Sequence, residues 1–257
     1  MSIILKNKFQ ADCMREAGKV VFHVHEALEK AIKPGITTKE LDDICAQCLK
    51  EHGAISSFFG YEGSFGAGPY PGNACISLNE EVIHGLPGLR KLRSGDIVSI
   101  DVGAYKNGFH GDAARTYIVG DVLEEDKKLI RVTEESFFKG LEFVKPGKRL
   151  YEVSGAIQDY IQSNGFSVVR DYVGHGIGKA LHESPEIPNY RPKDKGGGVR
   201  LVPGMTLAIE PMVNTGVYAV KVLDDLWTVV TKDGKNSAHY ENTVLVTDGE
   251  PEILTML

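Results

Sequence analysis

Residues 95–119, GDIVSIDVGAYKNGFHGDAARTYIV, predict a β-hairpin that carries acidic side chains. Its two arms, residues 97–105 and 109–119, are rich in the β-branched and aromatic residues that favour strands. Between them, Asn107 and Gly108 form a dipeptide that is typical of a two-residue type I′ turn. The length of this turn determines which residues of the two arms face each other.

The predicted register places two aspartates on one face of the hairpin. Asp101 lies opposite Ala114, and Asp112 lies opposite Gly103. The aspartates are then diagonal neighbours, roughly 7–8 Å apart, and such short side chains can close around a shared ion. The alternative is a salt-bridged pair, but neither arm supplies a lysine or arginine near them on that face. Because unpaired like charges raise each other's pKa, a bound cation is the simpler hypothesis.

The composition is that of a globular protein. The chain has 257 residues, of which 42% are hydrophobic and 25% are charged. Its net charge of -6 argues against nucleic acid as the primary partner. No apolar run reaches the length of a membrane span, and the first residues lack the apolar region of a signal peptide. We therefore expect a cytoplasmic protein that binds no membrane and no specific nucleic acid.

The four cysteines indicate core packing. They are too few for a disulfide framework in a chain of this length. Cys45 and Cys48 have C-x-x-C spacing, but both fall on the apolar stripe of a predicted helix over residues 37–51, which begins with a capping box from Thr37 to Glu40. The sequence has no second C-x-x-C pair to complete a zinc site.

A supersecondary unit occurs twice in the chain. Helices are predicted over residues 12–31, 37–51, 129–144 and 150–163. Pro146 follows Pro34 by 112 residues, and Gly165 follows Gly53 by the same interval. The apolar stripe of the second helix also recurs in the fourth. This self-similarity is typical of a duplicated fold.

The duplication extends to the acidic residues. Asp101 and Glu210 each lie six residues after a glycine, at the end of a similar apolar segment. Glu241 begins a later β-rich segment, as Asp112 does in the return arm of the hairpin. We therefore predict an α+β fold of two pseudo-symmetric α/β halves, which form a curved, mostly antiparallel sheet with helices outside. The site is expected where the halves meet.

One histidine has the surroundings of a metal ligand. His175 lies between glycines, which removes bulk around the imidazole as close approach to an ion requires. His84 and His182 lie near glycine and proline, in turns that could place them at a site. His110 and His239, each two residues before an acidic residue, are weaker candidates.

The proposed ligand count favours a dinuclear centre. Four carboxylates and one imidazole carry a negative charge that two divalent cations balance. Two ions about 3.5–4 Å apart generate hydroxide at neutral pH and polarise a carbonyl, which is the chemistry of hydrolysis. Oxygen-rich ligation with one nitrogen suits Mn, Fe, Co or Zn, and the ligand types leave this choice open.

At these residues the chain resembles the type I methionine aminopeptidases of bacteria, which remove the initiator methionine from new proteins. The likeness covers residues 12–254. The matching motifs are SIDVG (99–103), HGD (110–112), GHGIG (174–178), HESP (182–185), IEP (209–211) and ENT (241–243). The resemblance implies the pita-bread fold, a single metallopeptidase domain over residues 1–257, and cleavage when the second residue of the substrate is small.

The resemblance also implies a role for each candidate residue. The implied ligands of two divalent metal ions per chain are Asp101, Asp112, His175, Glu210 and Glu241. Glu210 is also the implied proton shuttle, and His84 and His182 are expected to contact the substrate and the tetrahedral intermediate. The apolar methionine pocket is expected to be lined by Tyr61, Tyr70, Cys75, Leu181 and Trp227.

Two departures from the family pattern bear on substrate and partners. The connection from Tyr61 to Cys75 is longer than in the shortest family members, which leaves open which tyrosine lines the pocket. The loop over residues 217–235 has few basic residues, which weakens the inference that it docks on ribosomal RNA. The implied partners are the N-terminal methionine of nascent polypeptides and, transiently, the ribosome. We expect a monomer.

Two other functions remain as alternatives. The first is another pita-bread peptidase, of the proline-specific aminopeptidase or prolidase kind, which has the same ligand order. Those enzymes usually carry an additional N-terminal domain, whereas the first helix of the repeat begins here by Asp12. The second is a non-enzymatic binding protein on the same fold. Such proteins lose ligands, and here all five are present.

Overall fold

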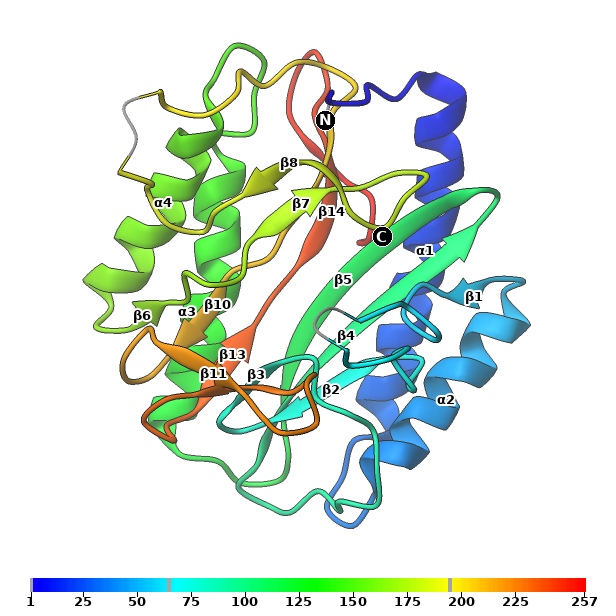
Figure 1. The fold of residues 1–257 in the computed structure, drawn as a ribbon, viewed down its shortest axis with the longest axis vertical. Coiled ribbons are helices and arrows are strands. Elements are labelled where there is room, and N and C mark those ends of the chain that lie inside the picture. Colours follow the sequence, from blue (N-terminus) through cyan, green and yellow to red (C-terminus); the bar gives the residue numbers. More distant parts are fainter. Residues whose placement is uncertain (1, 64–65, 194–195) are drawn as a thin grey trace.

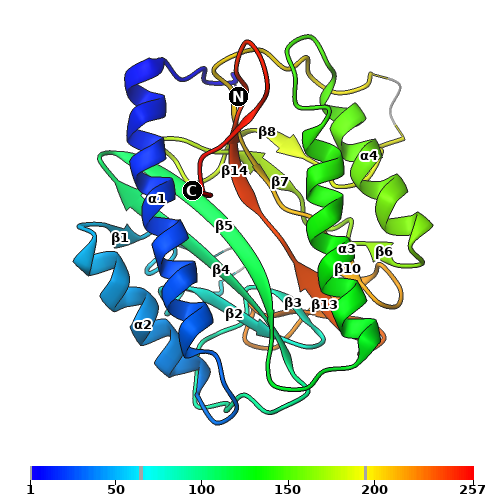
Figure 2. The ribbon, with the colours of Figure 1, turned by 180° about the vertical axis from the view of Figure 1, so that it is seen from behind.

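Two pairs of helices lie on one side of the strands in this computed structural model, which describes residues 2–63, 66–193 and 196–257 (Figure 1). The helices are α1 (Lys8–Ala31), α2 (Thr38–Glu51), α3 (Glu124–Leu141) and α4 (Leu150–Ser163). Figure 2 shows them in front of the strands, with α1 and α2 over one half and α3 and α4 over the other. The described part of the chain has no helix that is both long and apolar enough to cross a membrane.

The strands form short antiparallel sheets in both halves. They are β1 (Ile55–Ser56), β2 (Cys75–Leu78), β3 (Glu81–Ile83), β4 (Ile97–Lys106), β5 (Phe109–Ile118), β6 (Ser167–Val168), β7 (Gly174–Gly176), β8 (Glu183–Ile187), β9 (Thr206–Ile209), β10 (Met212–Asn214), β11 (Val220–Val222), β12 (Val229–Thr231), β13 (Ser237–His239), β14 (Asn242–Leu245) and β15 (Glu252–Ile253). In the first half β1, β2 and β5 all pair with β4, and in the second half the strand order is β15-β14-β9-β7-β8.

The β4–β5 hairpin has the predicted register. Asp101 faces Ala114 and Gly103 faces Asp112. Asn107 and Gly108 have φ angles of 53° and 82°, the left-handed values that a type I′ turn requires at both central positions. The prediction from the Asn-Gly turn is therefore confirmed, because the turn length alone determined the pairing.

The two halves meet where β5 lies beside β14. The Glu241 amide donates a hydrogen bond to the Ala114 carbonyl (2.9 Å), and the Thr243 hydroxyl donates to the Asp112 carbonyl (3.0 Å). The guanidinium of Arg115 donates to the carbonyls of Ala114 and Glu241, so one side chain ties both strands together. These contacts bring the two acidic segments to one place.

Corresponding features recur in the two halves. Helices α2 and α4 each have 14 residues, and each is followed by a glycine with positive φ, Gly53 at 64° and Gly165 at 88°. Each helix pair covers its own hydrophobic core, built around Leu41 in the first half and Phe137 in the second. Two pseudo-symmetric halves with an antiparallel sheet and outer helices were predicted, and this fold class is confirmed.

Two predicted helix boundaries were wrong. Helix α1 begins four residues before Asp12, because Asn7 and Gln10 form a capping box that starts the helix earlier. Helix α3 spans Glu124–Leu141 instead of residues 129–144. Its first turn has three acidic residues, which interact favourably with the positive end of the helix dipole, so helical structure extends upstream of the apolar stripe.

Cys45 and Cys48 are buried, free thiols on α2. Both belong to the hydrophobic core of the first half. Burial raises the pKa of both thiols, which keeps them protonated and poorly reactive. Their interpretation as core residues is confirmed.

Helix α1 crosses the sheet and the C-terminal segment at a glycine. A Cβ on Gly18 would lie 1.9 Å from the Leu254 carbonyl oxygen, and a Cβ on Gly111 would lie 2.9 Å from the Gly18 amide nitrogen. No side chain fits at either position without backbone movement. This close crossing supports β5 next to Asp112.

We expect Gly18→Ala to destabilise the protein by about 2 kcal/mol. Overpacking costs up to about 3 kcal/mol, and the better helix propensity of alanine offsets about 1 kcal/mol of it. Urea unfolding of the variant and of the original protein measures the difference. Gly88→Ala is the matched control, because no atom lies within 4 Å of its added Cβ. Equal midpoints for Gly18→Ala and Gly88→Ala would contradict the close crossing.

Candidate active site

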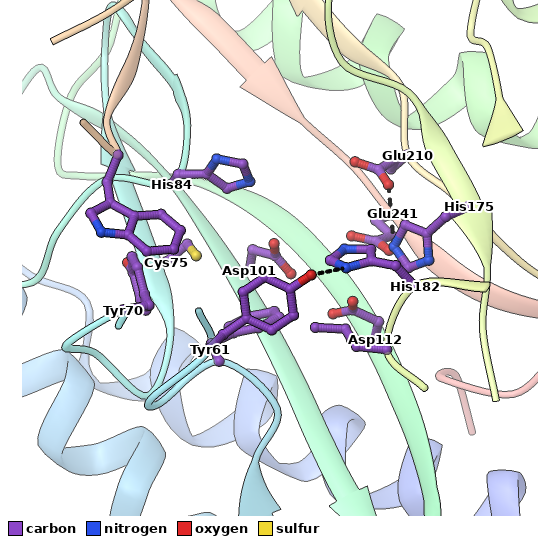
Figure 3. Close-up of a pocket in the computed structure, with 13 residues that line it drawn as sticks. Tyr61, Tyr70, Cys75, His84, Asp101, Asp112, His175, His182, Glu210 and Glu241 are labelled. Carbon is purple, nitrogen blue, oxygen red and sulfur yellow. Dashed lines mark hydrogen bonds and ion pairs between the residues drawn. The ribbon is translucent and has the colours of Figure 1, made fainter. Parts of the chain in front are cut away.

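The five predicted metal ligands come together from both halves (Figure 3). Asp101 lies on β4, Asp112 on β5 and His175 on β7, while Glu210 directly follows β9 and Glu241 directly precedes β14. All five line one pocket. The sequence pattern placed two carboxylates in each half, and the β5–β14 junction brings the two pairs together.

The four carboxylates are buried and poorly satisfied. One oxygen each of Asp101, Asp112 and Glu241 is buried without a hydrogen-bond partner. Burial raises the pKa of all four, that of Asp101 to about 7, and the neighbouring carboxylates raise those of Asp112, Glu210 and Glu241 further. Among the described residues, their ion-pair partners are histidines and include no lysine or arginine. Unpaired oxygens with raised pKa values fit a cation site.

His175 presents its Nε2 atom to the carboxylates. Its Nδ1 lies 2.9 Å from the Gly176 carbonyl oxygen and donates to it, which leaves the Nε2 lone pair free. Nε2 lies 3.6 Å from Glu210 Oε1. Burial lowers the pKa of His175 to about 3, so the ring is neutral, as a metal ligand must be.

The glycines beside His175 have a role that differs from the predicted one. A Cβ on Gly174 would lie 2.3 Å from the Ala208 carbonyl oxygen, and a Cβ on Gly176 would lie 2.2 Å from that of Ser184. The glycines therefore let β7 fit between β8 and β9. The pairing of β7 with β8 also shifts its register between His175 and Gly176, so the ladder is irregular at the histidine itself.

His84 and His182 both line the pocket. In Figure 3, His84 lies on the side of Cys75 and His182 lies beside His175. His182 Nδ1 lies 2.7 Å from the Tyr61 hydroxyl, and its ring stands edge-on to that of His175 at 4.3 Å. His84 has a left-handed φ of 60°, an uncommon conformation for a residue with a side chain. Burial lowers the pKa of both rings, that of His84 to about 4, so both are neutral at pH 7.

An apolar chamber opens directly onto the carboxylates. The cavity has a volume of about 140 Å³. All five residues predicted for the methionine pocket line it: Tyr61, Tyr70, Cys75, Leu181 and Trp227. Both tyrosines of the long connection therefore line the cavity. Residues 64 and 65 of that connection lie outside the described residues.

Two residues at the site were missed or underrated. Phe58 also lines the cavity, and nothing in the run Phe58-Phe59 distinguishes the inward ring from the exposed one. His239 was only a weak candidate, yet its side chain is 2% exposed and its Nε2 lies 3.8 Å from Glu210 and 3.9 Å from Glu241. Its counterpart His110 instead bonds Ser57 through Nδ1 (2.8 Å).

Comparisons with known proteins identify the family of the chain. The chain matches metallopeptidase family M24 over residues 12–248. It is 55% identical to methionine aminopeptidase 1 of Bacillus subtilis, over 98% of this chain and 99% of that protein.

Solved structures have the same fold. The crystal structure of methionine aminopeptidase from Thermotoga maritima matches with a TM-score of 0.94 and 46% identity, over the whole of both chains. Prolidase from Pyrococcus furiosus matches with a TM-score of 0.77 and 23% identity, over 99% of this chain and 66% of that one. The fold is thus the pita-bread fold of these proteins. With a match over most of its length and relatives this similar, the chain belongs to metallopeptidase family M24.

Proposed function

We propose that this protein is a metal-dependent aminopeptidase that removes the N-terminal methionine from nascent polypeptides when the second residue is small. One observation carries the proposal: an apolar chamber with a thiol and aromatic rings opens directly onto a cluster of carboxylates. A methionine thioether makes favourable contacts with aromatic rings such as Tyr70 and Trp227. The full-length relatives named methionine aminopeptidase support the same substrate.

Two divalent ions per chain are proposed at the carboxylates. Their ligands are Asp101, Asp112, His175, Glu210 and Glu241, and the native metal is one of Co, Mn, Fe or Zn. When bound, the ions lower the pKa of a water molecule and polarise the scissile carbonyl. The unpaired carboxylate oxygens and the free Nε2 of His175 support this assignment.

The side chains around the ions have separate tasks. Glu210, whose pKa is raised by burial and by Asp101, can accept the proton of the attacking water and deliver it to the leaving amine. His182 Nδ1 is hydrogen-bonded to the Tyr61 hydroxyl; in the tautomer in which Nδ1 accepts, Nε2–H is left to donate to the substrate. His84 is a second neutral donor for the carbonyl oxygen on which negative charge develops.

Proline-specific peptidase activity is the less favoured alternative. The chain is only 23% identical to prolidase from Pyrococcus furiosus, and a similarity at that level shows a shared fold alone. We further propose that residues 1–257 act as one domain and one monomer. The substrate is a nascent chain, so the proposed place of action is the cytoplasm, with only transient ribosome contact.

Substrate preference tests the proposal. We expect kcat/KM to be highest for Met-Ala peptides, lower by about 10–200-fold for Leu-Ala, and low for Met-Leu, because pocket shape discriminates a first residue by about 1–3 kcal/mol. Norleucine should replace methionine with little loss. The peptides are compared at one metal concentration. A preference for X-Pro peptides, or equal rates on Met-Ala and Leu-Ala, would refute the assignment.

Metal removal should make stability depend on pH. The pKa of Asp101, raised by burial from its ordinary 3.8 to about 7, means that this carboxyl binds more protons in the folded protein than in the unfolded chain between these values. Its contribution to the stability of the chelated protein therefore falls as pH rises toward 7, by about 2.5 kcal/mol between pH 5 and 7.5. The buried histidines act in the opposite direction, because burial lowers their pKa below the value of about 6.5 that they have in the unfolded chain, so the Asp101 contribution is measured as a difference from a variant that lacks this carboxyl.

Urea unfolding of chelated and Co²⁺-loaded protein at the two pH values measures this effect. Relative to the chelated protein, the loaded protein should gain stability as pH rises, since the bound ions require ionised carboxylates. Asp101→Asn is the matched variant: in the chelated state, the free energy of unfolding of the original protein minus that of the variant should fall by about 2.5 kcal/mol over the interval. A difference that stays constant or rises with pH would contradict the electrostatic account of the site.

His84→Ala and His182→Ala should each lower kcat by about 10²–10³-fold while metal content stays near that of the original protein. Each substitution removes a donor to the reacting carbonyl and no metal ligand. Kinetics and metal analysis on the same samples test this. His23→Ala, on α1 and paired with Glu26 away from the pocket, is the control. Loss of metal in proportion to activity would reassign both histidines as ligands.

A further inference from the structure

We propose that His239 is a sixth protein ligand of the metal centre and supplies it with a second imidazole. The inference rests on the proposed function, because it adds a residue to the same centre. The first observation is that His239 Nε2 is buried and has no hydrogen-bond partner among the described residues. A buried polar atom without a partner costs free energy, so its persistence needs a reason.

The distances around His239 fit a shared ion. Its Nε2 lies 3.8 Å from Glu210 Oε2 and 3.9 Å from Glu241 Oε2. Both distances exceed hydrogen-bond length. Two atoms that bind one ion at about 2.1 Å each can lie up to about 4.2 Å apart. His175, with its Nε2 3.6 Å from Glu210 Oε1, stands in the same relation to the other oxygen of that carboxylate.

The side chains near His239 form sets of three that are compact enough to hold one ion. Ligand atoms of Glu210, His239 and Glu241 all lie within 4.8 Å of one another, as do those of Asp112, His175 and Glu241. The two groups share Glu241. Each therefore combines one imidazole with two carboxylates, which gives each of two ions a nitrogen ligand.

The backbone of His239 is held in place by the first half of the fold. Its amide donates to Thr116 Oγ1 (2.9 Å), and Thr116 Oγ1 donates to its carbonyl (2.8 Å). This double contact ties the end of β13 to β5. His110, the counterpart two residues before Asp112, has its Nδ1 taken by Ser57. Of the two related histidines, only His239 lies within ion-pair distance of the clustered carboxylates among the described residues.

A second imidazole changes the expected metal preference. Imidazole suits Zn and Fe, whereas ligation by oxygen alone suits Mn and Mg. We therefore expect loss of His239 to weaken Zn²⁺ binding more than Mn²⁺ binding.

Nitrogen NMR of the intact protein tests the ligand directly. Long-range ¹H–¹⁵N spectra of the eight histidine side chains are recorded before and after saturation with Zn²⁺. The Nε2 resonances of His175 and His239 should both move to the position of a metal-bound nitrogen, while those of His110 should not. Single His→Gln variants assign the three rings.

Zn²⁺ titration of His239→Gln gives a second readout, with His110→Gln as the matched control. His239→Gln should weaken at least one site by about tenfold or more, and His110→Gln should not. If His175 moves and His239 keeps a protonated Nε2, His239 is only a hydrogen-bond donor to Glu210 and this inference fails while the metal centre stands. If neither resonance moves, the metal centre and the proposed function fail with it.

Discussion

Burial of four carboxylates at one point of the sheet is the constraint on which the rest of the structure depends. Ionised carboxylates in a poorly solvated site repel one another and lose hydration, and burial is the largest cause of each raised pKa. Such a site is unfavourable for the protein alone. Divalent cations would offset this repulsion and the lost hydration. The buried carboxylates that lower the stability of the metal-free protein therefore favour binding of metal.

Interactions outside the pocket hold the acidic strands together. The guanidinium of Arg115 donates to the backbone carbonyls of Ala114 and Glu241 and to none of the carboxylates of the cluster. Its charge lowers the pKa of Glu241, but burial and the neighbouring carboxylates raise that pKa by more. Its charge therefore stabilises the junction without pairing with the acids. The glycine crossing of α1 with β5 at Gly18 and Gly111 supports the same region. A junction fixed in this way can present unpaired oxygens without collapsing.

The sequence was most informative where a local rule determined a long-range result. The Asn107-Gly108 turn predicted the whole β4–β5 register, and the repeat predicted two matching halves. Helix starts were predicted less well, because the Asn7 cap lies outside the apolar stripe. The glycines around His175 were assigned to ion approach, whereas the packing of β7 against its neighbours, which is invisible in the sequence, requires them.

His239 shows the limit of periodicity. Alternation placed both His239 and His110 on the faces of their acidic neighbours, so the sequence offered no means of choosing between them. The choice depends on Ser57, which contacts His110, and on Thr116, which contacts His239; the members of each pair are far apart in sequence and meet only in the folded chain. Ser57 is hydrogen-bonded to the Nδ1 atom of His110, whereas Thr116 bonds only the backbone of His239.

The duplicated strands and the unduplicated connections have different tasks. Each half contributes two carboxylates from equivalent strands, so neither half contains the whole cluster and the proposed metal site requires the joined fold. The pocket is built differently: Tyr61 and Tyr70 come from a connection in the first half, and Leu181 and Trp227 come from connections in the second. Substrate specificity can therefore change by substitution in the connections, while the chemistry of the symmetric strands is retained.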